Sequence, residues 1–287
     1  MIQQRDLSII SNRLLKENGG RRIPEKTIEL DYALGWFLAE LAQHGFGDKL
    51  AFKGGTALRR CHIGEYRFSE DLDFTLLKDD VTFEQVQAAF EEVASKVKDR
   101  TGMDFQFGTP DRTPHRNSHT FTMRFTGPMR AEREFKVDIT IAECIVGELE
   151  RKPVLRTYDV FDFPEAASVK CYSLDEIVIE KLVALTDKQR TQPRDLYDLW
   201  YMTAEGHVDI STLAAAVAKK LDFRQRSAEG LQEIFKGKKA ALDRTWKTRL
   251  DPQMAEIPEF ESVFREVERL IRQSNVFEEA LKIQKQV

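Results

Sequence analysis

Apolar residues recur along the chain at two spacings, and both occur in its first part. Residues 24–46 carry them at the spacing of a helix, and residues 49–52 predict a short strand. A glycine turn then opens a second helix from Gly54 to about Cys61. Residues 67–77 predict another strand, in which apolar and polar positions alternate. Strand, turn, helix and strand are therefore expected in that order.

The downstream pattern completes the first domain and then changes. Residues 82–100 predict an amphipathic helix, and alternation predicts strands at residues 103–107, 120–125 and 134–141. After about Pro164 the spacing is helical almost throughout. The chain is therefore expected to be an α+β protein, with a mixed α and β domain over residues 1–165 and a helical domain over residues 166–287.

Composition excludes several other classes of protein. The 287 residues suffice for roughly two domains at about 150 residues each, and 41% apolar with 32% charged residues is typical of a globular chain. No apolar stretch approaches the roughly 20 residues of a membrane helix, and the N-terminus lacks an apolar signal core. The three cysteines suit neither a disulfide framework nor a zinc site. A cytoplasmic protein without membrane contact is expected.

The net charge of −4 conceals an uneven distribution. Residues 219–249 contain ten Lys and Arg against four acids, so this segment carries +6 and the remainder −10. Such asymmetry favours a polyanionic partner. The alternative is a pair of solvated amphipathic helices whose aromatic residues face the core. The residues expected to contact a polyanion are Lys219, Lys220, Arg224, Lys236, Lys238, Lys239 and Lys247.

Three carboxylates are candidates for metal binding. Asp71 and Asp73 are two residues apart in a predicted strand, so both side chains point to the same face. Asp138 lies on the polar side of the alternating strand at residues 135–141, from which it can join the pair. Acids two residues apart are also common on surfaces. A divalent cation with oxygen ligands is the natural partner of such a cluster.

The glycine turn just upstream adds a phosphate site. In the run Lys53, Gly54, Gly55, Thr56, the glycines let the backbone approach a phosphate, and the helix that follows offers free N–H groups to the anion. A glycine pair before a helix is also a common tight turn. Together with the three acids, however, the turn indicates a site for a metal-bound nucleoside triphosphate.

This combination resembles the nucleotidyltransferase superfamily, whose pattern is hG[GS], then [DE]h[DE]h, then h[DE]h. The run KGGTAL, RFSEDLDF, EKLVAL and RDLYDLW more specifically resembles the AbiEii/MenT family of nucleotidyltransferases, toxins of bacterial toxin–antitoxin and phage-defence systems. The motifs cover residues 52–74, 135–141 and 173–200, and the resemblance covers most of the chain. It implies a nucleotidyltransferase fold with a mixed sheet, followed by a helical domain that adds residues to the site.

The first of these added residues is Lys181. Ser173 and Glu176 form a predicted capping box, and the helix that follows carries Lys181 on the same face as Leu174. An ammonium on an inward face needs an anionic partner, unless the lysine extends from the edge of the apolar stripe to water. The resemblance implies that Lys181 contacts the nucleotide phosphates.

Two acids follow on the next predicted helix, which starts at Pro193. Asp195 and Asp198 share a face, and Arg194 can pair with Asp198. The resemblance implies a catalytic or orienting role for Asp195, supported by Asp198 and Arg194. The spacing does not separate the two acids.

The resemblance also implies a reaction. Asp71, Asp73 and Asp138 would hold Mg²⁺ or Mn²⁺, and the nucleotide would contact Lys53, Gly54, Gly55, Thr56 and Ser69, with Arg67 in support. The implied acceptor is the 3′ end of tRNA, whose blockage stops translation, and a cognate antitoxin is implied as partner. A small-molecule or protein hydroxyl is an alternative acceptor, and a nucleotide-binding module without turnover is the other alternative. The transferred nucleotide stays open.

Overall fold

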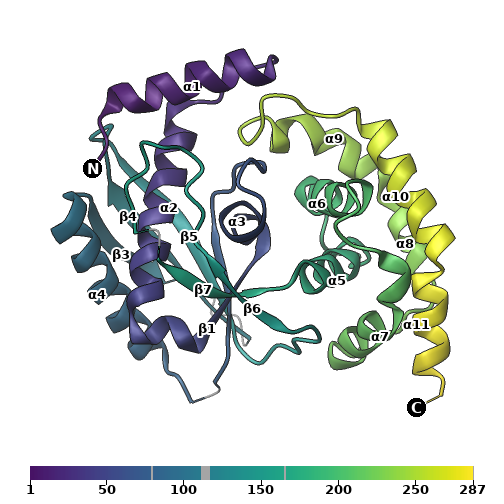
Figure 1. Ribbon diagram of the computed structural model, residues 1–287. Coiled ribbons are helices and arrows are strands. Elements are labelled where there is room, and N and C mark those ends of the chain that lie inside the picture. Colours follow the sequence, from purple (N-terminus) through teal and green to yellow (C-terminus); the bar gives the residue numbers. More distant parts are fainter. Residues whose placement is uncertain (79, 111–116, 165, 287) are drawn as a thin grey trace. The chain divides into compact units, whose positions relative to one another are not determined.

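The computed structural model describes residues 1–78, 80–110, 117–164 and 166–286. The chain divides into two compact units, each described here by itself (Figure 1). The sheet unit comprises Met1–Glu143, Leu149–Tyr172 and Pro252–Glu256. The helical unit comprises Cys144–Glu148, Ser173–Asp251 and Ile257–Val287. Each unit thus includes a short segment from the other's part of the sequence.

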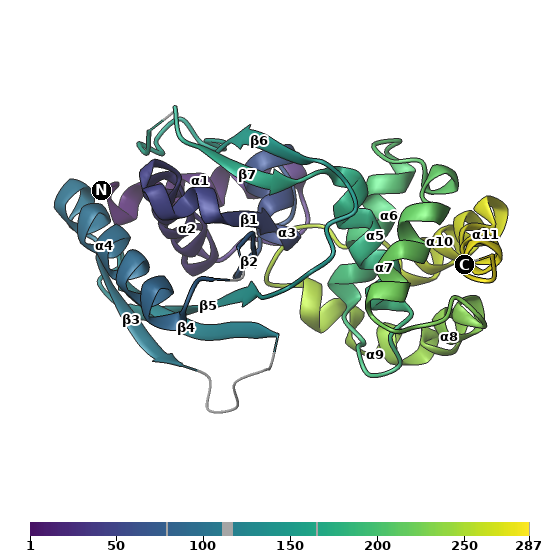
Figure 2. The ribbon, with the colours of Figure 1, turned by 90° about the horizontal axis from the view of Figure 1, so that it is seen from below.

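A seven-stranded sheet forms the centre of the sheet unit, in the order β3-β4-β5-β2-β1-β7-β6 (Figure 2). β2 runs parallel to β5 and β1 parallel to β7, whereas the other neighbours are antiparallel, so the sheet is mixed as predicted. The strands are β1 Leu50–Lys53, β2 Leu72–Leu76, β3 Asp104–Pro110, β4 Ser118–Thr126, β5 Glu132–Thr140, β6 Leu149–Pro153 and β7 Ser168–Tyr172.

The helices of this unit pack mainly through aromatic side chains. Phe37 of α2 lies 5.6 Å from Phe105 of β3 between ring centroids, and Phe90 of α4 lies 5.3 Å from Phe121 of β4. Such contacts bury large apolar surfaces and fix α2 and α4 to one face of the sheet. The helices are α1 Gln4–Asn18, α2 Glu25–Gln43, α3 Gly54–Ala57 continued by a π-helical turn at Leu58–His62, and α4 Phe83–Thr101.

The two faces of the sheet differ in polarity, as β5 shows. Phe135, Val137 and Ile139 are buried, whereas Lys136 between them is exposed and Asp138 half-buried. Because side chains alternate across a strand, the apolar residues face the aromatic core and the polar residues face the other side. The predictions for residues 24–46, 82–100 and 134–141 are confirmed as α2, α4 and β5.

The prediction of one strand over residues 67–77 is wrong in its first half, since β2 begins only at Leu72. The chain before β2 pairs instead with a distant segment: the Phe68 N–H donates to the Gln253 carbonyl at 2.8 Å. Arg67 donates to the Gln253 side chain at 2.8 Å. Backbone hydrogen bonds satisfied outside the sheet therefore delay the start of the strand.

β6 and β7 were not predicted, and β7 lies beyond residue 165, where helices were expected. β7 has only five residues, and its parallel pairing with β1 joins Cys171 to Phe52, far apart in sequence. A strand this short carries little periodicity of its own.

Among the residues that the structure describes, the helical unit contains helices and no strand. Phe235 and Phe264 stack with centroids 4.9 Å apart, and the indole of Trp246 donates to the Pro258 carbonyl at 2.9 Å. None of the described helices is long and apolar enough to cross a membrane. The helices are α5 Leu174–Leu185, α6 Pro193–Ala204, α7 Ala214–Phe223, α8 Leu231–Gly237, α9 Lys239–Leu250, α10 Phe260–Ser274 and α11 Val276–Gln284.

Candidate functional site

A row of polar residues crosses four strands of the sheet unit. In the strand register, Lys53 of β1 pairs with Asp73 of β2, Asp73 with Asp138 of β5, and Asp138 with Thr120 of β4. Paired residues on neighbouring strands point to the same face. The sheet therefore aligns an ammonium, two carboxylates and a hydroxyl, which we call the polar row.

Hydrogen bonds fix both ends of the polar row. Lys53 Nζ donates to Thr140 Oγ1 at 3.0 Å and lies 5.6 Å from the ring centroid of Tyr172. Thr120 Oγ1 donates to Asp138 Oδ1 at 3.2 Å. Since Thr140 lies on β5, the lysine side chain extends across β2 beside Asp73. Positive charge therefore lies next to the two adjacent carboxylates.

The glycine turn after β1 packs directly against the polar row. Gly54 has a φ of +79°, and a Cβ at that position would lie 2.5 Å from Asp73 Oδ2. A Cβ at Gly55 would lie 2.7 Å from Arg67 Nη2 and 3.1 Å from Ser69 Oγ. At position 54, only glycine fits both the left-handed backbone and the close approach to Asp73. The structure thus brings Gly54, Gly55, Arg67, Ser69 and Asp73 together.

Thr56 holds the chain that enters β2. Its side chain is buried, and Oγ1 donates a hydrogen bond to the carbonyl of Asp71. The hydroxyl proton is therefore used to hold the segment that enters β2 against α3. Asp71 itself precedes β2 and is half-buried. Gln253, the partner of Arg67, was missed by sequence reasoning, because only the fold brings Pro252–Glu256 to this place.

The donors of the polar row suit a hard divalent cation. Mg²⁺ is usually bound by one or two carboxylates together with substrate phosphates, and Asp73 and Asp138 are adjacent in register. Within the described residues, His, Cys, Asp and Glu side chains form no group of three or more that could hold a metal ion. Asp71, Asp73 and Asp138 therefore stay predicted ligands.

In the helical unit, Lys181 has the anionic partners that its position requires. Its Nζ lies 2.7 Å from Asp195 Oδ1 and 2.8 Å from Asp198 Oδ2. Asp195 also pairs with Arg190, Nε to Oδ2, at 2.7 Å. Sequence reasoning missed Arg190, although it lies only five residues before Asp195. Arg194 lies half-buried in the first turn of α6.

Two opposing effects set the pKa of Asp195. Burial of the carboxyl raises its pKa, but the positive charges of Lys181 and Arg190 outweigh burial and hold the pKa below its ordinary value. Asp195 is therefore an anion at neutral pH. The group of Lys181, Asp195 and Asp198, with Arg190 on the outside, is a nearly buried ion cluster.

Lys220 is wrongly predicted as a polyanion contact. It is fully buried on α7, where Nζ lies 2.5 Å from Glu176 Oε1 and donates to the Cys144 carbonyl at 2.7 Å. The Glu176 carboxylate also accepts from the N–H groups of Val146 and Gly147 at 2.9 and 2.8 Å. Ser173 caps α5 as predicted, whereas Glu176 holds Cys144–Glu148 to α5 instead of completing a capping box.

Lys238 is wrongly predicted for the same reason. It is buried and donates to the carbonyls of Asp187 and Arg190, so it holds the loop between α5 and α6. Burial lowers the pKa of this lysine. Of the other predicted contacts, Lys219 and Lys247 are exposed. The remaining three form ion pairs with glutamates: Arg224 with Glu180, Lys236 with Glu233 and Lys239 with Glu261.

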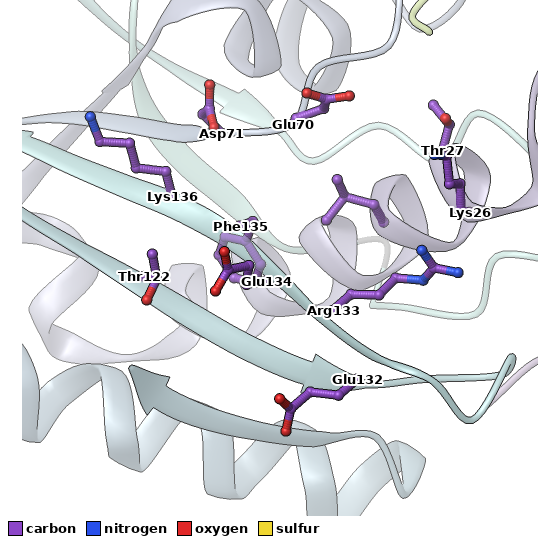
Figure 3. Close-up of a pocket in the computed structure, with 11 residues that line it drawn as sticks. Lys26, Thr27, Glu70, Asp71, Thr122, Glu132, Arg133, Glu134, Phe135 and Lys136 are labelled. Atoms are coloured by element: carbon purple, nitrogen blue, oxygen red, sulfur yellow. The ribbon is translucent and has the colours of Figure 1, made fainter. Parts of the chain in front are cut away.

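A pocket of about 460 Å³ lies beside Asp71 in the sheet unit (Figure 3). β5 and β4 line one side with Glu134, Lys136 and Thr122, and Glu70 and Asp71 line another. The first turns of α2 add Lys26, Thr27 and Leu30. The lining therefore combines apolar residues with side chains of both charges.

Comparisons with known proteins identify a family and a fold. The family model described as "Nucleotidyl transferase AbiEii toxin, Type IV TA system" matches residues 36–273. The curated protein sequences give no match. Among solved structures, the chain is similar to MenT4, a nucleotidyltransferase toxin from Mycobacterium tuberculosis H37Rv, with a TM-score of 0.64, 19% identity and coverage of 99% of each chain. At that identity the likeness establishes the fold, and the α+β prediction is confirmed.

Proposed function

The chain belongs to the AbiEii family, the nucleotidyltransferase toxins of type IV toxin–antitoxin systems, and on that basis we propose that it transfers a nucleotide from a nucleoside triphosphate to the 3′ end of a tRNA. The observation that carries the proposal is the polar row with its glycine turn, in which Lys53, Asp73 and Asp138 are aligned in register. The product would be a tRNA that cannot be aminoacylated, which makes the enzyme toxic.

Asp71, Asp73 and Asp138 would hold Mg²⁺ or Mn²⁺, which would neutralise the phosphates and polarise the α-phosphorus when bound. The adjacent register of Asp73 and Asp138 supports this role, and Thr56 holds the backbone of Asp71 next to them by a hydrogen bond to its carbonyl. Catalysis would rest on positioning and on charge stabilisation, because phosphoryl-type transfer requires little else from a protein.

The glycine turn would bind the triphosphate. Gly54 lies half-buried against Asp73, and Gly55 lies buried against Arg67 and Ser69. Lys53 and Arg67 supply positive charge next to this backbone. Ser69 Oγ, close to Gly55, would donate to a phosphate oxygen. Thr56 would act through its hold on Asp71.

In the helical unit, Lys181 would neutralise charge as pyrophosphate leaves. Asp195 and Asp198 keep its ammonium in place, and Arg190 adds positive charge on the exposed side. The anionic carboxylate of Asp195 would therefore orient the ammonium of Lys181. Arg194 would support the cluster from the start of α6.

The first experiment incubates the full chain with Mg²⁺, total bacterial tRNA and each of four labelled nucleoside triphosphates. Label on tRNA is expected from wild type, with at least a 100-fold lower rate from Asp73→Asn. Asp104→Asn is the matched control, because Asp104 lies on the edge strand β3 and contacts Lys98 and Gln106. Transfer to a small-molecule or protein hydroxyl instead of tRNA would replace the acceptor in this proposal.

The non-catalytic alternative is a module that binds the nucleotide without turnover. It would bind the triphosphate, lose binding in Asp73→Asn, and label no acceptor at all.

A cognate antitoxin is expected from the family. Co-expression of the chain with the neighbouring reading frame in bacterial cells would test whether the antitoxin relieves toxicity. Unrelieved toxicity would contradict that expectation.

A further inference from the structure

The pocket beside Asp71 shares only that residue with the nucleotide site proposed above. Its walls come from β4, β5, α2 and the chain before β2, all within the sheet unit. We propose that this pocket, the acceptor pocket, binds the terminal ribose of the RNA that receives the nucleotide. The inference rests on the proposed function and names the part of the chain that holds the second substrate.

The order of the strands places the pocket on the side that the reaction needs. From β1 to β4 the sheet runs β1, β2, β5, β4. The glycine turn follows β1, the carboxylates lie on and before β2 and on β5, and the pocket lies over β5 and β4. The leaving pyrophosphate and the attacking hydroxyl stand on opposite sides of the phosphorus in an in-line displacement. If the turn holds the phosphates, the nucleophile must come from the β5 side.

Asp71 connects the pocket to the polar row. The pairing of β2 with β5 begins at Leu72 and Val137, so the residues just before them, Asp71 and Lys136, stand at the boundary between row and pocket. Figure 3 shows Asp71 and Glu70 on one side of the pocket and Glu134 on another. A hydroxyl bound here would lie next to the predicted metal ligands.

The lining of the pocket favours a sugar over a phosphate. The lining carries four carboxylates against the two amines of Lys26 and Lys136, and its Arg133 is paired with the buried Glu29 at 2.6 Å. The carboxylates are those of Glu70, Asp71, Glu132 and Glu134. In the part of the chain described, Glu134 and Lys136 form no ion pair, so both are available to a ligand. Carboxylates accept hydrogen bonds from adjacent ribose hydroxyls and repel phosphates, and lysine and threonine add donors. A volume of 460 Å³ suits one nucleoside.

The step itself balances without a further reactant. The acceptor hydroxyl oxygen forms a bond to the α-phosphorus, the bond from that phosphorus to pyrophosphate breaks, and the hydroxyl proton passes to water by way of the carboxylates. Glu134 and Lys136 are positioning residues in this account, since they hold the ribose and not the reacting phosphorus.

The test labels the pocket directly, using the full chain. A short RNA hairpin with a single-stranded 3′ end is oxidised with periodate, which turns its terminal ribose into a dialdehyde. The aldehyde condenses with a nearby lysine amine to an imine and water, and cyanoborohydride reduces the imine to a stable amine. Peptide mapping should find Lys136 labelled at least tenfold more than the exposed Lys96 of α4, and unoxidised hairpin should compete. Equal labelling of both lysines, or no labelling, would overturn the acceptor pocket.

A kinetic measurement separates this inference from the proposed function. Glu134→Gln should raise the KM for RNA about tenfold while the KM for the nucleotide and the unfolding midpoint stay unchanged. The exposed Glu91→Gln on α4 should change none of the three. Labelled Lys136 without transfer to RNA would refute the proposed function and leave the pocket standing. Transfer with an unchanged KM in Glu134→Gln would refute the pocket alone. Oxidised adenosine serves as a second probe. If it labels Lys136 with the same yield as the oxidised hairpin, the ligand is a small sugar-bearing molecule and the RNA assignment is refuted.

Discussion

Lys219 and Lys220 are neighbours on α7 with opposite surroundings. Lys219 is exposed, whereas Lys220 is fully buried between Glu176 at 2.5 Å and Glu180 at 3.3 Å. Removing one partner of a buried ion pair leaves an uncompensated charge, at a cost of about 3–5 kcal/mol. Lys220→Ala should therefore lower the free energy of unfolding by about 3 kcal/mol or more in urea denaturation.

Lys219→Ala is the matched control for that prediction and should change the free energy of unfolding by less than about 0.5 kcal/mol. Similar stability of the two variants would contradict the buried position of Lys220. The sequence contained a signal for this burial, because Val217, Lys220 and Leu221 share one helical face. A count of charges over residues 219–249 does not detect this burial, because the count treats buried and exposed lysines alike.

Asp195 predicts a dependence of stability on pH. Its pKa is held below the ordinary value in the folded chain, so the folded state binds this proton less readily than the unfolded state does. The resulting stability is present above the unfolded pKa of about 3.9 and is lost as pH falls through the folded pKa. Asp195→Asn should therefore lower the melting temperature at pH 7 and flatten its fall below about pH 4.

Thermal denaturation between pH 7 and pH 2 measures this effect, with Asp104→Asn as the partly exposed control. The pKa of Asp104 is also lowered, by hydrogen bonds from Lys98 and Gln106, but this carboxylate is at the surface and should change the curve little. Parallel curves for wild type and Asp195→Asn would contradict the ion cluster. The need of Lys181 for an anion was predictable from the sequence, and Arg190 was not, because a loop residue carries no periodicity.

At the scale of elements, the turn between β1 and α3 depends on Gly54. Gly54 and Gly102 both have positive φ, +79° and +77°, but a Cβ at Gly54 meets Asp73 at 2.5 Å whereas one at Gly102 meets nothing within 4 Å. Gly54→Ala and Gly102→Ala should each lose about 1 kcal/mol from the left-handed backbone. Only Gly54→Ala should also displace Asp73 and reduce nucleotide transfer by at least about 100-fold.

Urea denaturation and transfer assays on both variants separate the two effects. Equal transfer rates would show that the close approach of the turn to Asp73 has no part in catalysis. The turn was predictable because glycine spacing is local. The start of β2 was not, since Gln253 takes the backbone and side-chain contacts of residues 67 and 68 from the far end of the sequence. β7 was missed similarly, as its pairing with β1 is non-local.

At the scale of the whole molecule, the basic segment serves the interior of the helical unit as well as its surface. Lys220 and Lys238 are buried, and Arg226 donates to the carbonyls of Val183 and Thr186 near the end of α5. Glutamates neutralise Arg224, Lys236 and Lys239. Of the seven predicted contacts, Lys219 and Lys247 are thus the exposed lysines best suited to an RNA backbone.

RNA binding by the whole chain should therefore depend on few charges. Removing one lysine that binds a phosphate lowers the slope of log K against log salt by about 0.7–0.9, so Lys219→Gln with Lys247→Gln should reduce the slope by roughly 1.5. Fluorescence anisotropy of labelled tRNA between roughly 50 and 300 mM salt, about a sixfold range, measures this slope. The exposed pair Lys96→Gln with Lys98→Gln on α4 removes the same charge and should leave the slope unchanged. Equal reductions in both double variants would mean that the RNA responds to net charge alone, because a directed contact distinguishes positions whereas a diffuse attraction does not.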